Sequence, residues 1–187
     1  MSNATLMSGM IREIAWASEA IAEMQVADEF DRYEKAWLDY LHYLDRGWNK
    51  LEKLLEGISQ QKLSHARQTR KSDALLSYLM HARNVDEHTV RQVVAKRPGS
   101  LKITGGPGGG TIHRGVFSGD GQVGNLVYEG ALDIDFVPER MEIIGVTDRG
   151  VLYDIPAHHL GVPLKSLIPH DLAQLALDYY KSLLNGN

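Results

Sequence analysis

Three residues that could act together on RNA lie close to one another in this chain. Arg83 and Asn84 are adjacent, and His88 follows a few positions later. A guanidinium binds phosphate through two parallel hydrogen bonds, and an imidazole exchanges protons near neutral pH. The histidine would remove the proton of a ribose 2′-hydroxyl, the freed oxygen would attack the adjacent phosphorus, and the arginine would stabilise the charge on the phosphoryl oxygens. This chemistry needs no metal, and it excludes DNA, which lacks the 2′-hydroxyl.

The apolar pattern around these residues predicts a helix over residues 72–96, with Ser72 as its N-cap. At about 100° per residue, His81, Asn84 and His88 project within about 60° of one another and form a polar stripe. We therefore expect Asn84 to orient the substrate or the histidine. We expect His81 to serve as a second acid or base.

Arg83 projects toward the apolar side of the same helix, where Glu87 lies one turn away and could hold it in an ion pair. In an undistorted helix Arg83 and His88 are about 140° apart, so one helix does not place both at one phosphate. Two facing copies of the helix could do so. We therefore expect a homodimer in which the copies share a cleft.

The spacing Arg-Asn-x-x-x-His, from Arg83 to His88, resembles the signature of the HEPN superfamily of helical bundles. The resemblance implies a metal-independent endoribonuclease, typically dimeric, such as a toxin or a phage-defence effector. Other members of that superfamily are inactive nucleotide or partner binders, so the alternative is a non-catalytic dimeric binding or assembly protein with a protein partner. Asp86 and Glu87 depart from the expectation, because acidic groups inside the motif repel phosphate.

A basic segment precedes the predicted motif helix. Between Gln60 and Lys71 the chain has no acidic residue, and it contains Lys62, Arg67, Arg70 and Lys71. One interpretation is a strip that contacts RNA phosphates, and the other is an ordinary solvated loop or helix face.

The sequence predicts an α+β fold, mainly a HEPN-like helical bundle with an antiparallel β-meander inserted before the C-terminal helix. The bundle spans residues 5–97, the meander 98–160 and the returning helix 165–185. The first two helices are expected at 6–25 and 28–56, and the short strands at 101–104, 111–117, 122–128, 131–137, 141–146 and 151–155. No gap between these strands can hold a crossover helix, so they should pair antiparallel, with a hairpin turn at 147–150.

The apolar stripes of the helices define the expected core. Large side chains from Phe30 to Leu55 recur at helical spacing in the second helix and are expected to be buried. The first helix presents a stripe of Ile11, Ile14, Ala15, Ser18, Ile21 and Ala22, and the last a stripe of Leu172, Leu175, Ala176, Tyr179, Tyr180, Leu183 and Leu184.

Two further patterns in the sequence resemble ligand sites. The glycine-rich run 105–110 is followed by a β pattern and has no Lys-Ser/Thr pair, so a flexible hairpin loop explains it better than a phosphate loop. Five residues could supply metal ligands, but they lack the spacing of a metal motif: His113, Asp154, His158, His159 and His170. We expect neither a metal nor a cofactor.

Composition limits the class of protein. The 187 residues carry a formal net charge of −4, so any surface that binds nucleic acid must be local. The chain has no cysteine and no apolar run of the roughly 20 residues that a membrane span needs. We expect a cytoplasmic protein that does not bind membranes.

Overall fold

The computed structural model describes residues 3–88, 92–117, 123–137 and 139–185, and leaves out the side chains of residues 86–88, 101, 117, 123–125, 134–137 and 185. The chain forms two compact units, Met1–Ala95 with Ile143–Asn187, and Lys96–Glu142. Mixed helix and strand confirm the α+β class. None of the helices in the described ranges combines the length and apolar character of a membrane span.

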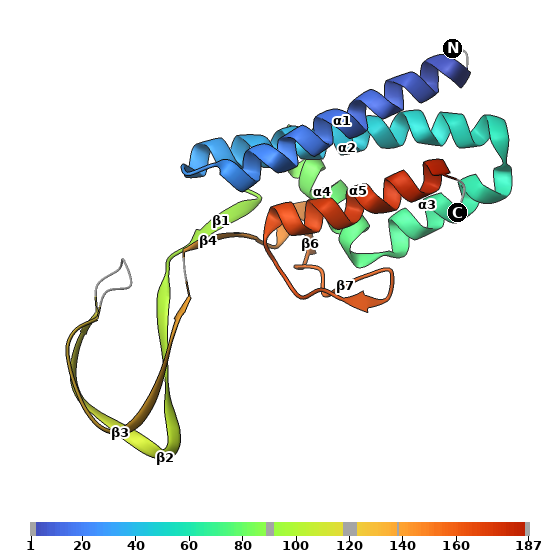
Figure 1. The fold of residues 1–187 in the computed structure, drawn as a ribbon. Coiled ribbons are helices and arrows are strands. Elements are labelled where there is room, and N and C mark those ends of the chain that lie inside the picture. The colour runs from blue at the N-terminus through green and yellow to red at the C-terminus, as the bar shows by residue number, and fades with distance from the viewer. Residues whose placement is uncertain (1–2, 89–91, 118–122, 138, 186–187) are drawn as a thin grey trace. The chain divides into compact units, whose positions relative to one another are not determined.

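Helices make up most of the first unit. The described residues form α1 (Asn3–Val26), α2 (Phe30–Ile58), α3 (Gln60–Ser72), α4 (Ala74–His88) and α5 (Pro169–Asn185). Figure 1 shows α1 lying along α2, and α5 packs against α1, α2 and α4. The C-terminal helix therefore returns to the helices of the N-terminal half.

The apolar stripe of α2 is buried, as predicted. Trp37 and Tyr40 are fully inaccessible, and the Tyr40 hydroxyl donates a hydrogen bond of 2.8 Å to the carbonyl of Ala173 in α5. This bond satisfies the polar end of a buried aromatic ring and joins two helices that lie far apart in sequence.

The predicted stripe of α1 was wrong for most of its members. Ile11 is 56% exposed, whereas the buried face carries Met10, Ala17, Met24 and a fully buried carboxylate, Glu13. Glu13 forms ion pairs with Lys50 and Arg46 of α2. Helical periodicity alone could not identify this face, because a charged residue occupies one of its central positions.

The helix that carries the motif is shorter than predicted. It begins after Asp73, whose side chain accepts the backbone N–H of Leu76 at 2.9 Å, so Asp73 and not Ser72 is the N-cap. It ends at His88, and strand β1 (Val94–Arg97) takes up residues that were assigned to the same helix. Val93 and Val94 are buried, but as part of an extended segment.

The predicted meander was wrong, because the strands form separate pairs instead of one sheet. Strand β1 pairs with β4 (Arg140–Ile143), and β2 (Ser100–Phe117) pairs with β3 (Val123–Val137). The other two pairs are β5 (Val146–Asp148) with β6 (Val151–Tyr153), and β7 (His158–His159) with β8 (Val162–Pro163). The two later pairs belong to the first unit, so only residues 96–142 form a unit of their own within the expected insertion 98–160.

The glycine-rich run is part of strand β2, not a hairpin loop. Gly105 pairs with Leu132 and Gly110 with Gly130, so four residues, 106–109, lie opposite Ala131 in a large bulge. A Cβ at Gly106 would come within 2.8 Å of the Cβ of Ala131, so the two strands approach too closely there for a larger residue. The glycines thus permit a long hairpin to continue through an irregular segment.

Candidate functional site

Helix α4 presents two groups of polar side chains to different neighbours in the first unit. Leu75, Leu79 and Ala82 form its buried side. His81 and Asn84 meet strand β5, whereas Arg83 meets helix α2. The helical periodicity thus predicted correctly that Arg83 lies apart from the polar stripe.

His81 and Asn84 bind the same carboxylate oxygen. The Nδ1 atom of His81 lies 2.8 Å, and the Nδ2 atom of Asn84 3.0 Å, from Oδ2 of Asp148. The His81 ring also stacks on Tyr153, with centroids 3.5 Å apart and an interplanar angle of 16°. The imidazole is therefore held by a stacking contact on its face and by a hydrogen bond at its edge.

The short hairpin β5–β6 positions Asp148 and Tyr153. Arg149 and Gly150 connect the strands, and both have positive φ angles, 50° and 81°, as a type I′ turn requires. The turn predicted at residues 147–150 is confirmed. Asp148 is the last residue before it and is only 7% exposed.

The charge state of Asp148 determines the tautomer of His81. The hydrogen bond from His81 is the main cause that holds the pKa of Asp148 below its ordinary value, and Asn84 contributes in the same direction against the cost of desolvation. An ionised carboxylate only accepts hydrogen bonds, so Nδ1 of His81 carries the proton and Nε2 of the neutral ring has a free lone pair. Nε2 makes no hydrogen bond to any residue that the structure describes. This arrangement suits a proton acceptor.

Arg83 belongs to a second cluster, in which two arginines share one aspartate. Arg83 Nη2 lies 3.5 Å from Oδ2 of Asp45, and Arg70 Nη2 lies 2.7 Å from Oδ1. The guanidinium of Arg70 also lies over the ring of Trp48, 4.7 Å from its centroid. The three charged side chains of this cluster are between 13% and 23% exposed.

The remaining motif residues lie at the end of α4. The backbone of Glu87 and His88 belongs to the last turn of the helix, but their side chains are outside the described residues. The structure therefore places Arg83, Asn84 and His81, and it gives Arg83 a partner, Asp45, that the sequence had not suggested.

The basic segment forms helix α3. Two of its four side chains that were predicted to contact phosphate form ion pairs with acidic residues of α2. Arg67 Nε lies 2.7 Å from Oε1 of Glu52, and Arg70 is paired with Asp45. Lys62 and Lys71 are exposed. Arg70 is thus directed into the molecule rather than toward solvent.

The other histidines do not converge on one another. His158 is exposed and His159 is buried, as adjacent strand residues should be, and Nδ1 of His159 lies 3.0 Å from Oδ1 of Asp73. His170 contacts the hydroxyl of Tyr33 at 3.0 Å. Within the described ranges, no three His, Asp or Glu side chains come together as a metal site would require.

Sequence reasoning missed Asp148 and Tyr153. The sequence placed Asp148 only in a turn, and 67 positions separate it from His81. The sequence contains no signal for this pair, because the burial of Asp148 and its contact with His81 arise only in the folded chain.

Comparisons of the chain with family models, with curated protein sequences and with solved structures found no match. The contacts of α4 with α2 and β5 are therefore the evidence for a function.

Proposed function

We propose that this chain is a HEPN-like, metal-independent endoribonuclease that acts as a homodimer, with the residues of α4 lining a cleft between two copies. The observation that carries the proposal is the fixed imidazole of His81, whose Nδ1 is bound to Asp148 beside Asn84. A histidine held in one tautomer by a carboxylate is an effective proton acceptor.

The reaction would be a transesterification. A histidine of α4, His88 or His81, takes the proton of the ribose 2′-hydroxyl, and the 2′-oxygen forms a bond to the adjacent phosphorus. The bond from phosphorus to the 5′-oxygen breaks, that oxygen takes a proton from the other of these two histidines, and a 2′,3′-cyclic phosphate remains. Arg83 stabilises the charge on the phosphoryl oxygens through its planar guanidinium, which lies beside that of Arg70 at Asp45.

The directions of Arg83 and His81 on α4 are the reason for proposing a dimer. Arg83 points to α2 and His81 to β5, so these two residues of one copy face different surroundings. A second copy could bring its own histidines to the Arg83 side of the first. Such a toxin or phage-defence effector would gain its active site only on dimerisation.

The test is incubation of the purified chain with a mixed RNA pool in excess EDTA. We expect cleavage by the native chain and at least a hundred-fold loss in His81→Ala, His88→Ala and Arg83→Ala, since general acid–base catalysis contributes about 10²–10⁴-fold. His158→Ala is the matched control, because this histidine is exposed on β7. A circular dichroism spectrum verifies the fold of each variant. Intact RNA with the native chain in every pool would contradict the proposal.

A second candidate, a non-catalytic dimeric binding or assembly protein, is favoured by one observation. Three predicted site residues of α4 bind acids of the same chain, Arg83 on Asp45 and both His81 and Asn84 on Asp148. They could serve only to join α4 to α2 and β5. In that case the native chain would leave RNA intact and would still sediment as a dimer, and Arg83→Ala would lower the melting temperature.

A further inference from the structure

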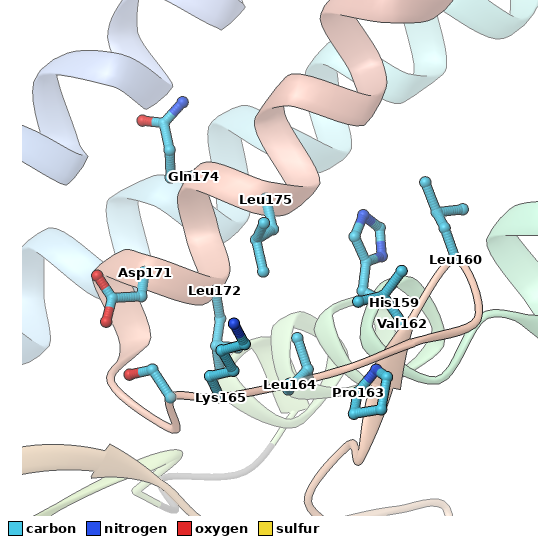
Figure 2. Close-up of a pocket in the computed structure, with 11 residues that line it drawn as sticks. His159, Leu160, Val162, Pro163, Leu164, Lys165, Asp171, Leu172, Gln174 and Leu175 are labelled. Atoms are coloured by element: carbon cyan, nitrogen blue, oxygen red, sulfur yellow. The ribbon is translucent and has the colours of Figure 1, made fainter.

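A pocket of about 550 Å³ lies between helix α5 and the segment that contains β7 and β8. Its middle is apolar, with Leu164 on the segment and Leu172 and Leu175 on the helix (Figure 2). His159 lies at one end and Asp171 at the other. The volume is within the range of about 300–1,000 Å³ that is typical of small-molecule sites.

The rim of this pocket exposes several large apolar side chains together. Leu160 is 51% exposed, Val162 64% and Leu175 41%. Leu175 had been predicted to lie in the buried stripe of α5, and it faces this pocket instead. Adjacent apolar groups left in water are unfavourable, and such patches commonly mark a binding site.

One polar side chain in the pocket wall, that of His159, is buried and is held in one orientation by a hydrogen bond. His159 is 8% exposed, and its Nδ1 lies 3.0 Å from Oδ1 of Asp73. Asp73 also accepts the backbone N–H groups of Leu160, at 2.6 Å, and Leu76, at 2.9 Å. Burial alone would raise the pKa of Asp73, but these hydrogen bonds together hold it below its ordinary value.

An ionised Asp73 requires a proton on Nδ1 of His159, so Nε2 of the neutral ring is a hydrogen-bond acceptor. Nε2 has no hydrogen-bonding partner among the described residues. Nε2 is not one of the fully buried polar atoms that lack a partner, so it reaches solvent and a ligand donor can bind it there.

We propose that this pocket binds a small molecule of the phenol class, whose apolar body contacts Val162, Leu164 and Leu175 and whose hydroxyl donates a hydrogen bond to Nε2 of His159. The site is independent of the ribonuclease proposal. It shares no residue with the clusters of His81 and Arg83.

The test is isothermal titration of the full chain with two probes, 4-propylphenol and 4-propylanisole, in which a methyl group replaces the hydroxyl proton. We expect the phenol to bind about five- to tenfold more tightly, as one recovered hydrogen bond provides. His159→Asn keeps an amide donor near the Nδ1 position, toward Asp73, and removes Nε2, so it should abolish the difference between the probes. Leu175→Trp should fill the pocket and weaken both.

Leu152→Ala is the matched control, since Leu152 is 63% exposed on β6, outside the pocket lining. It should leave both affinities unchanged. Equal affinities of the two probes for the native chain would overturn the role of His159. Failure of both probes to bind at millimolar concentration, or binding that Leu175→Trp does not weaken, would overturn the site itself.

Discussion

One carboxylate oxygen of Asp148 accepts hydrogen bonds from two side chains of α4, so removal of Asp148 breaks both bonds. In Asp148→Ala, Nδ1 of His81 and Nδ2 of Asn84 both lose their acceptor in a part-buried place. We expect the free energy of unfolding to fall by about 2 kcal/mol, the usual cost of lost hydrogen bonds to a charged group. Urea denaturation measures the change. Asp39→Ala is the control, because its ion pair with Lys35 is exposed and should matter little; an equal effect of both variants would contradict the argument.

The same aspartate, together with Asp73, predicts a pH dependence of stability. The pKa of each is lower in the folded chain than its ordinary value of 3.8. Below that value the unfolded chain binds more protons than the folded chain, so the stability that these carboxylates provide is complete above about pH 5 and is lost as the pH falls below 4. The deficit of Asp148→Asn relative to the native chain should therefore shrink between pH 6 and pH 3 in thermal unfolding. A constant deficit would show that ionisation of Asp148 does not stabilise the fold.

At the scale of elements, the sequence patterns predicted most helices and strands and the antiparallel pairing, but not the division of the strands into separate pairs. The large side chains of α2 repeat at helical spacing with few interruptions, and Trp37 and Tyr40 are indeed buried. In α1 the charged Glu13 occupies the buried face and hides it from such a pattern. The continuous pairing of β2 with β3 could not be predicted, because glycines that end a strand elsewhere continue β2 here.

In the candidate site, too, the positions within one helix were predictable and the contacts between elements were not. The helical spacing correctly grouped His81 with Asn84 and separated Arg83 from them. The acids that bind these side chains, Asp148 and Asp45, lie on other elements. Their positions depend on tertiary packing, for which a single sequence contains no signal.

The long hairpin provides a test of its irregular segment. Gly130 has a φ angle of 85°, and a Cβ added there would collide with the carbonyl oxygen of Gly109. Gly130→Ala should therefore lower the hydrogen-exchange protection of the amides of β2 near the bulge by about tenfold or more, since strain and collision add. Gly108→Ala is the matched control, with a φ angle of 95° but open space around the Cβ, and it should lower protection less. Equal protection in both variants would mean that the strands do not approach as closely as the geometry indicates.

At the scale of the whole molecule, the proposed dimer makes a prediction about pairs of inactive chains. Arg83 and His88 are about 140° apart on an ideal helix, so a composite site would take Arg83 from one copy and His88 from the other. Arg83→Ala and His88→Ala would each be inactive alone. After mixing in equal amounts and exchange of subunits, about half of the dimers would be mixed, and one of the two sites in each would have both residues.

The mixture should therefore recover about one quarter of the native RNA cleavage, measured at the same total chain concentration in EDTA. Sedimentation of labelled chains verifies that the subunits have exchanged. Mixing Arg83→Ala with the double variant Arg83→Ala/His88→Ala is the matched control, because no site in that mixture contains Arg83. If the first mixture stays inactive although the subunits exchange, Arg83 and His88 act within one copy, and the shared cleft is refuted even where the native chain cleaves RNA.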